Sequence, residues 1–266
     1  MTKQVICINW GTRYGAAYIN RLYGMVARNI TPPFRFVCFT DVTEGVHEAV
    51  ECKPLPDLRG AHPERTIGKW GKSRLWETGL GGLEGPVLFI DLDVAIVSSL
   101  DPFFDFGDPD DVVLAHNAAK PFHRLGQTSL YRFPVGKLAP ILEIYAADPQ
   151  GVADKYRFEQ HFVTKNAPGG IKFWPRAWVR HFRIQCLPRF PMNYFVTPKR
   201  PGGDAKVVIF AGSLNPTDAI AGRWHKDEAV VGPWAHIKRC WKARAKFSAY
   251  RRYLRPARWI EEVWRE

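Results

Sequence analysis

The stretch VLFIDLDVAIV, residues 87–97, places two carboxylates, Asp91 and Asp93, inside a run that otherwise has the composition of a buried strand. A carboxylate buried without compensation costs several kcal/mol, so the pair requires a cation, a set of backbone donors or open water. In open α/β sheets, ligands bind beyond the carboxyl ends of the strands. Both aspartates follow directly on the apolar residues 87–90, which indicates a site rather than a simple turn.

The segments before this strand alternate between strand-like and helix-like patterns. Residues 4–10 and 34–41 have the composition of strands, and apolar residues between them, from Ile19 to Val26, recur at helical spacing. This alternation predicts an α/β fold with a mainly parallel sheet and helices on its faces. The further expected strands are 50–55, 111–116, 128–133 and 205–212, and the further expected helices are 68–80 and 137–148. The strand at 205–212 is expected to close the main domain.

The composition is that of a globular protein, with 46% hydrophobic and 24% charged residues among 266. That length suffices for one large α/β domain or two small ones. The sequence has no run of eighteen apolar residues, and MTKQVICINW at its start continues directly into a strand, so we expect a cytoplasmic protein. The five cysteines are widely spaced without a C-x-x-C pair, which predicts reduced core residues.

The formal charge of +12 is concentrated near the C-terminus, where residues 236–260 include nine Lys or Arg and no Asp or Glu. We therefore expect a main domain over residues 1–222 and a basic helical extension over 223–266. Apolar residues in this extension recur at spacings of three and four, which predicts one apolar stripe on a basic helix. They are Cys240, Ala243, Phe247, Tyr250 and Leu254. Such a helix suits an anionic membrane surface or packs on the main domain, and no motif supports binding of nucleic acid.

The pair Asp91 and Asp93 allows more than one chemistry. Carboxylates at i and i+2 of an extended chain point to the same side and can converge on Mg²⁺ or Mn²⁺, which leave positions for substrate phosphates. The alternative is that both aspartates only end a strand and accept backbone N–H bonds. A third interpretation is the D-x-D of haloacid-dehalogenase-like phosphatases. It is disfavoured because a strand-helix-strand unit precedes the motif and the acidic cluster DFGDPDD (105–111) follows too closely.

A more specific resemblance covers about residues 4–222. The segment VLFIDLDVAIVSSLDPFF (87–104) resembles the metal-binding segment of GT-A-fold glycosyltransferases, especially the glycogenin and lipopolysaccharide galactosyltransferase group. INWGTRYGAAYINRLYGMV (8–26) and FRFVCFTD (34–41) resemble the nucleotide-binding start of bacterial members. The resemblance implies a Rossmann-like mixed, mainly parallel sheet flanked by helices.

The resemblance also implies roles for residues near the D-x-D motif. Asp91 would contact the ribose or the metal, Asp93 would be a metal ligand, and Lys72 would lie near the donor sugar or diphosphate. Thr12 and Tyr14, after the first strand, would belong to the base-binding turn, although Tyr14 could equally be a packing residue. The same turn would include Asp41, which ends the second strand.

EQHF (159–162) looks like the acidic-Gln pair that family members present to the reacting face of the donor sugar. Glu159 and Gln160 would then be catalytic, with Gln160 orienting the sugar or stabilising positive charge beside an oxocarbenium-like carbon. The alternative is an exposed helix. The segment Gln127, Thr128 and Ser129 would line the sugar pocket.

The sequence departs from the family after its last strand, where a pattern like F-H-G-x-x-K-P supplies a metal-binding His and a diphosphate-binding Lys. Ala211 and Asn215 stand at these positions. Ala lacks a lone pair and Asn lacks a charge, so His225, His116 or a basic residue of the extension would have to replace them.

Taken with the resemblance, the sequence predicts a metal-assisted glycosyltransferase with a nucleotide-sugar donor, for which a UDP-sugar is expected. Its acceptor would be a bacterial surface glycan or a lipid-linked sugar at the inner face of the cytoplasmic membrane. The resemblance implies retention of anomeric configuration. The alternative function is a catalytically degenerate scaffold at the membrane, which the departures at Ala211 and Asn215 motivate.

Overall fold

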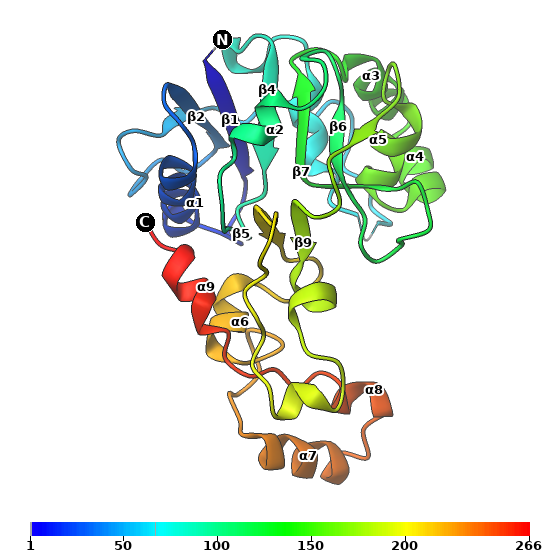
Figure 1. Ribbon diagram of the computed structural model, residues 1–266. Coiled ribbons are helices and arrows are strands. Elements are labelled where there is room, and N and C mark those ends of the chain that lie inside the picture. Colours follow the sequence, from blue (N-terminus) through cyan, green and yellow to red (C-terminus); the bar gives the residue numbers. More distant parts are fainter. Residues whose placement is uncertain (1, 67) are drawn as a thin grey trace. The chain divides into compact units, whose positions relative to one another are not determined.

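A computed structural model describes residues 2–66 and 68–266. The chain forms two compact units (Figure 1). Unit 1 contains the residues up to Leu92 together with Ser99–Arg176, and unit 2 contains Asp93–Ser98 and Ala177–Glu266. The chain therefore passes from unit 1 into unit 2 inside the D-x-D motif and returns six residues later.

Unit 1 is the larger α/β unit, and its expected strands and helices are confirmed with small shifts of their ends. Its elements are β1 (Lys3–Asn9), α1 (Ala16–Asn29), β2 (Phe34–Thr40), β3 (Glu51–Lys53), the 3-10 helices η1 (Trp70–Trp76) and η2 (Leu80–Gly82), β4 (Pro86–Ile90), α2 (Asp101–Asp105), β6 (Val113–His116), β7 (Gly126–Pro134), α3 (Ala139–Ala147), α4 (Pro149–Tyr156), α5 (Glu159–Asn166) and β8 (Lys172–Phe173).

The strands of unit 1 form one seven-stranded sheet in the order β3-β2-β1-β4-β7-β6-β8. Strand β7 runs antiparallel to both of its neighbours, while the other adjacent pairs are parallel. The expected fold class, a mixed and mainly parallel sheet with helices, is confirmed. The chain moves from β1 to β2 on one side, and β4 later joins β1 on the other side. The carboxyl ends of β1 and β4 therefore flank a topological switch point, the usual ligand position in such sheets.

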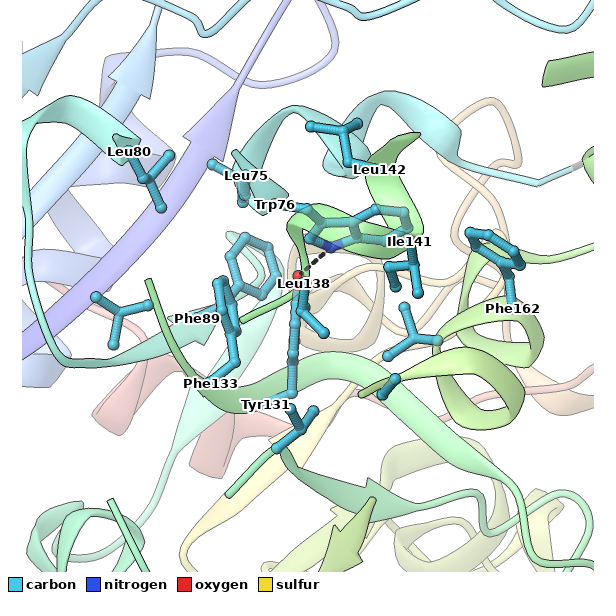
Figure 2. Close-up of a cluster of buried hydrophobic side chains, with 14 of the residues drawn as sticks. Leu75, Trp76, Leu80, Phe89, Tyr131, Phe133, Leu138, Ile141, Leu142 and Phe162 are labelled. Carbon is cyan, nitrogen blue, oxygen red and sulfur yellow. Dashed lines mark hydrogen bonds between the residues drawn. The ribbon is translucent and has the colours of Figure 1, made fainter. Parts of the chain in front are cut away.

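The main core of unit 1 lies between one face of the sheet and η1, α3, α4 and α5 (Figure 2). Its centre includes the indole of Trp76, whose Nε1 donates to the Tyr131 hydroxyl at 3.3 Å. On the opposite face α1 packs through Tyr23, whose ring meets Phe36 of β2 edge-on at 5.6 Å. All five cysteines are free, and four of them are buried. Both faces of the sheet are thus covered, which explains the nearly continuous apolar strands in the sequence.

Unit 2 is built around a smaller sheet in the order β5-β10-β9. Its elements are β5 (Val94–Ile96), β9 (Val179–His181), the π-helix η3 (Phe182–Cys186), the 3-10 helix η4 (Met192–Tyr194), β10 (Val207–Ile209), α6 (Pro216–Ala221), α7 (Pro233–Lys242), α8 (Phe247–Tyr250) and α9 (Arg258–Val263). The strand expected at 205–212 forms as β10, but it lies in this smaller sheet and not in the seven-stranded sheet. Strand β10 pairs with β5, the short strand that follows the D-x-D motif and belongs to unit 2. Apart from the short segment Asp93–Ser98, the boundary between the compact units lies after Arg176. The division into a main domain over 1–222 and an extension over 223–266 stays a prediction.

The prediction of a single amphipathic helix in the basic C-terminal segment is wrong. Helix α7 ends at Lys242, because Arg244 has a φ of 47°, and only short helices follow it. Of the expected stripe, Cys240 and Leu254 are buried, whereas Phe247 is 59% exposed. Within residues 2–66 and 68–266, no helix is both long and apolar enough to span a bilayer.

Candidate functional site

The candidate site of unit 1 lies at the carboxyl edge of the sheet and is centred on a lysine-aspartate pair. Asp91 follows β4, and its backbone N–H donates to the carbonyl oxygen of Ser129 on β7 at 2.9 Å. Lys72, in the middle of η1, places its Nζ 2.6 Å from Asp91 Oδ1 and 2.8 Å from Oδ2. Both side chains are largely buried. This arrangement fixes a cation and a carboxylate at the end of the strand that carries the D-x-D motif.

Two further contacts hold the Lys72 ammonium in place. It lies 3.4 Å from the carbonyl oxygen of Thr128 and 5.1 Å from the centre of the Phe89 ring. Because η1 packs in the core through Trp70 and Trp76, the stem of Lys72 emerges from a rigid element. The ammonium is therefore held in position before any ligand arrives.

Glu159 belongs to the same cluster. It is the first residue of α5 and only 5% exposed, and Thr128 Oγ1 donates to its Oε2 at 2.7 Å. Burial raises the pKa of Glu159 to about 7, the charge of Lys72 and the hydrogen bond from Thr128 counteract this, and the charge of Asp91 adds to the increase. Oε1 has no hydrogen-bond partner among the described residues. Glu159 can therefore hold or release a proton near neutral pH, and it does not lie on an exposed helix.

Gln127, Ser129 and Gln160 are the sequence neighbours of Thr128 and Glu159 in this cluster. Gln127 Nε2 donates to Ser129 Oγ at 3.2 Å, and Gln127 Oε1 is buried without a partner in the part of the chain that the structure describes. Gln160 is half-buried, and its carbonyl oxygen accepts from Thr164 Oγ1 at 2.6 Å. The same hydroxyl accepts from the Gly126 N–H at 3.0 Å, so the first turn of α5 is tied to the start of β7.

The turn that the sequence predicts to bind the base lies where β1 and β2 end, and its role stays a prediction. The N–H of Gly11, a residue with a φ of 66°, donates to Asp41 Oδ2 at 3.3 Å, so the loop after β1 is held to the end of β2. Thr12 is exposed, and the Tyr14 ring contacts that of Tyr18 at 4.7 Å. The turn thus offers Asp41 and Thr12 to a ligand, while Tyr14 also has a packing contact.

Sequence reasoning missed two residues near this turn. Asn9, the last residue of β1, is buried and donates to Thr40 Oγ1 at 3.3 Å, while its Oδ1 has no partner in the described segments. Trp10 lies against η1, since a Cβ added at Gly71 would come within 2.8 Å of its ring. The signal for Asn9 was available, because it is a polar residue at the carboxyl end of an apolar strand, next to the position that Asp91 takes after β4.

The metal expectation rests on two carboxylates from different units, since Asp91 belongs to unit 1 and Asp93 to unit 2. Across residues 2–66 and 68–266, no group of three or more His, Cys, Asp or Glu could hold a metal ion. Two carboxylates still fit a hard cation such as Mg²⁺ or Mn²⁺, which commonly binds through one or two carboxylates and completes its shell with water and phosphate oxygens.

Ala211 and Asn215 depart from the family pattern, and His225 and His116 are the expected replacements. Asn215 and both histidines have other partners. In unit 2, Asn215 is the N-cap of α6 and its N–H donates to Asp218 Oδ2 at 3.4 Å, while His225 Nδ1 lies 3.1 Å from Asp227 Oδ2. In unit 1, His116 Nε2 lies 3.1 Å from Arg176 Nη2. Ala211 follows β10 and supplies no ligand atom from its side chain.

No protein-family model matches the sequence, and a search of curated proteins finds no match. Solved structures do match it. A complex of the galactosyltransferase LgtC with donor and acceptor sugar analogs is 15% identical, with a TM-score of 0.56 over 98% of this chain and 100% of that one. The chain has the fold of a glycosyltransferase. An active-site mutant of LgtC, in which a Gln is replaced by Glu, is 13% identical, with a TM-score of 0.57 over 84% of this chain and 90% of that one.

Two other glycosyltransferases share the fold. The bifunctional WbbM is 14% identical with a TM-score of 0.54, covering 81% of this chain and 46% of WbbM. GlyE of Streptococcus pneumoniae TIGR4 is 10% identical with a TM-score of 0.53, covering 100% of this chain and 65% of GlyE. At these identities the comparison establishes the fold alone, and the activity has to be argued from the residues.

Proposed function

We propose that the protein is a glycosyltransferase that moves a sugar from a nucleotide-sugar donor to a glycan or lipid-linked acceptor. The observation that carries the proposal is the cluster of Lys72, Asp91, Thr128 and Glu159 at the carboxyl edge of the sheet. It combines a lysine ammonium held in position, a carboxylate and an acid whose pKa burial raises to about 7, on a fold that LgtC, WbbM and GlyE also have. The LgtC complex with donor and acceptor sugar analogs supports the same ligand classes.

The diphosphate of the donor would bind beside Lys72 and the D-x-D motif. Asp91 and Asp93 would hold a divalent cation, Mn²⁺ or Mg²⁺, that neutralises the charge of the departing diphosphate. Lys72 contributes a second positive charge at a fixed position, which stabilises charge as it develops on the leaving group. On donor binding, Asp91 would exchange its contact with the Lys72 ammonium for one with the cation, while the ammonium stays in place and contacts phosphate oxygens.

The nucleoside would bind over the ends of β1 and β2. Asp41 and Thr12 offer an acceptor and a hydroxyl there, and Asn9 has a buried Oδ1 without a partner among the described residues. Paired donors and acceptors of this kind suit the hydrogen-bonding edge of a base. We propose uridine as the base, following the expectation from the sequence.

The sugar would lie over β7 and the first turn of α5. Gln160 would orient it and stabilise positive charge at its anomeric carbon, a role for a neutral amide because Gln is a poor nucleophile. The LgtC active-site mutant concerns a residue of the same type. Glu159, held by Thr128, would position the turn and keep negative charge away from the diphosphate while it is protonated. We propose retention of anomeric configuration.

The proposal is tested by the release of UDP from UDP-galactose, UDP-glucose and UDP-N-acetylglucosamine in the presence of Mn²⁺. We expect turnover with one of these donors, and a loss of at least about 100-fold in Asp93→Asn. Asp204→Asn, at an exposed aspartate of unit 2, is the matched control and should retain the wild-type rate. No turnover by the wild type, or equal rates in Asp93→Asn, would contradict the proposal.

The departures at Ala211 and Asn215 favour one alternative, a degenerate scaffold. A scaffold would keep its interactions in Asp93→Asn and release no UDP. A phosphatase would instead release phosphate from simple phosphomonoesters without any sugar nucleotide, and the same assay with such a substrate distinguishes it.

We further propose that unit 2 contacts an anionic membrane, which would place the protein on the inner face of the cytoplasmic membrane. Helix α7 buries His236 and Cys240, while Trp234 and Trp241 are each 78% exposed. These two indoles lie seven residues apart, near Lys238, on the face opposite to the buried pair. Exposed Trp beside Lys and Arg is typical of helices that lie in the headgroup region.

A further inference from the structure

A pocket of unit 1 lies beside the carboxyl ends of β6 and β8. It has a volume of about 610 Å³ and is formed by the end of β6, the loop after it and the segment that follows β8. Every residue that lines it belongs to unit 1. Of the residues considered above for the donor site only His116, a candidate replacement ligand, is in its wall, and His116 Nε2 lies 3.1 Å from Arg176 Nη2.

The pocket is basic. Its wall includes Arg124, Arg176, His116 and His123, and no acidic residue is among the residues that line it. A guanidinium presents five N–H donors in a planar fork that matches a carboxylate or a phosphate. The wall therefore suits an anion rather than a neutral or cationic group.

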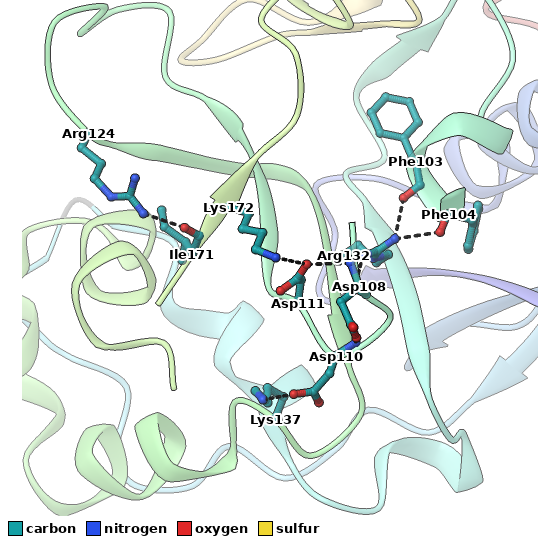
Figure 3. A network of polar contacts seen from close by, with 10 residues as sticks. All are labelled: Phe103, Phe104, Asp108, Asp110, Asp111, Arg124, Arg132, Lys137, Ile171 and Lys172. Carbon is teal, nitrogen blue, oxygen red and sulfur yellow. Dashed lines mark hydrogen bonds and ion pairs between the residues drawn. The ribbon is translucent and has the colours of Figure 1, made fainter. Parts of the chain in front are cut away.

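Both arginines are positioned by contacts with the protein. Arg176 Nη2 donates to the carbonyl oxygen of Pro121 at 3.0 Å and lies 3.1 Å from His116 Nε2. Arg124 Nη2 donates to the carbonyl oxygen of Ile171 at 2.6 Å (Figure 3). Among the described residues these contacts all use Nη2, so the remaining N–H groups of each fork can take a ligand.

The rest of the wall is aromatic. Phe122 is 99% exposed, which is unusual for a large apolar side chain, and Phe173 lies 5.5 Å below the Arg124 guanidinium. Trp174 and Phe106 also line the pocket. Flat rings next to arginine forks suit a ligand with an apolar face and an anionic group, and a sugar that bears a phosphate or carboxylate has both.

The place of the pocket in the fold connects it to the candidate site. Strands β4 and β6 both run antiparallel to β7, so their carboxyl ends lie at the same edge of the sheet. Where Phe89 and Leu114 both pair with Tyr131, the two strands are about 10 Å apart at ordinary strand spacing. The end of β6 is also linked to α5: His116 pairs with Gly126 of β7, and the Gly126 N–H donates to Thr164 Oγ1 of α5 at 3.0 Å. A ligand in the pocket therefore lies at the same edge of the sheet as the first turn of α5.

We propose that this pocket binds an anionic group, a phosphate or a carboxylate, carried by the acceptor glycan, through Arg124 and Arg176. The inference rests on the proposed glycosyl transfer, and it specifies that the acceptor carries a negative charge. It excludes a purely neutral oligosaccharide as the best acceptor.

The test is calorimetric titration of the full chain with glucose, glucose 6-phosphate and glucuronate. We expect both anionic sugars to bind at least tenfold more tightly than glucose, and the stronger of the two identifies phosphate or carboxylate as the natural group. In Arg124→Gln/Arg176→Gln this advantage should fall at least tenfold. Arg65→Gln, which removes a mostly exposed arginine elsewhere in unit 1, should keep it.

Equal binding of the three sugars, no binding of any of them, or an unchanged advantage in the double variant would overturn the inference. Thermal melting checks that the double variant is folded. If it is not, Arg176→Lys, which keeps the charge but loses the fork, should weaken the advantage by itself. A separate titration of the wild type with UDP reports on the donor site, so failure of the proposed function is distinguished from failure of the pocket.

Discussion

Two regions at the carboxyl edge of the seven-stranded sheet differ in how they manage charge. At the ends of β4 and β7, Lys72, Asp91 and Glu159 are buried or nearly so and contact one another or share Thr128. Beside β6 and β8, Arg124 and Arg176 are exposed and anchored through single nitrogens. In the first region the side chains are fixed by their contacts and the pKa of Glu159 is raised, which is common at catalytic sites. The second region is open and suits the recognition of a variable ligand.

The largest effect is expected in the buried region, from Lys72→Met. The substitution removes the ammonium that Asp91 and Thr128 hold while keeping an unbranched stem. We expect kcat/KM for sugar transfer to fall by about 10²–10³-fold, the usual effect of removing one fixed electrostatic stabiliser. Lys69→Met, at an exposed lysine three residues earlier, is the control. An equal and small effect of both substitutions would remove the distinction between buried and exposed cations.

Gln160→Ala separates a role in the reaction from a role in folding. Gln160 is half-buried, and its hydrogen bond with Thr164 uses only the backbone carbonyl. We therefore expect an unchanged melting temperature, unchanged affinity for UDP and a fall in kcat of about 10²-fold. Wild-type kcat in this variant would show that the first turn of α5 is only a structural element.

The raised pKa of Glu159 predicts a pH dependence of stability. Between its ordinary pKa of 4.5 and its pKa of about 7 in the folded protein, the folded state binds more protons than the unfolded state. The free energy of unfolding should therefore fall as pH rises through this window, by about 3 kcal/mol in total. Chemical denaturation at several pH values measures it, and Glu159→Gln should remove this part of the dependence. If the free energy of unfolding changed with pH equally in the wild type and in the variant, Glu159 would not have the raised pKa that its burial predicts.

The smallest effect concerns a third surface, the exposed face of α7, which shares with the pocket its aromatic and basic character. We expect Trp234→Ala/Trp241→Ala to weaken binding to vesicles that contain an anionic lipid by about tenfold. Phe195→Ala, at another aromatic residue of unit 2 that is 68% exposed, should leave it unchanged, as should the pocket variant Arg124→Gln/Arg176→Gln. If the pocket variant lost vesicle binding instead, lipid headgroups rather than acceptor glycans would explain the basic pocket.

The sequence predicted the elements of unit 1 well because their patterns are local. The apolar runs that became β1, β2 and β4 and the helical spacing that became α1 need no distant partner to be recognised. The D-x-D motif also stands out locally, since polar residues interrupt an apolar run. What the pattern could not predict was which residues meet: Lys72 and Asp91 are 19 positions apart, and Thr128 and Glu159 are 31 apart.

The failures in unit 2 and at the pocket have the same origin. Segment 205–212 has a strand pattern, but only tertiary structure decides that β10 pairs with β5 rather than with the main sheet. The periodic C-terminal segment breaks at Arg244, whose positive φ no propensity would suggest. Arg124 and Arg176 lie 52 positions apart and carry no motif, so the basic pocket is visible only in the folded chain.

We propose above that the carboxyl edge of the seven-stranded sheet binds a nucleotide-sugar donor with the help of a divalent cation. The most direct test is calorimetric titration with UDP, GDP and CMP, with and without Mn²⁺, of the wild type and of Asp91→Asn/Asp93→Asn. We predict Mn²⁺-dependent binding of UDP by the wild type and its loss in the variant. Absence of binding of all three nucleotides to the wild type would contradict the claim, and the scaffold function would then be favoured.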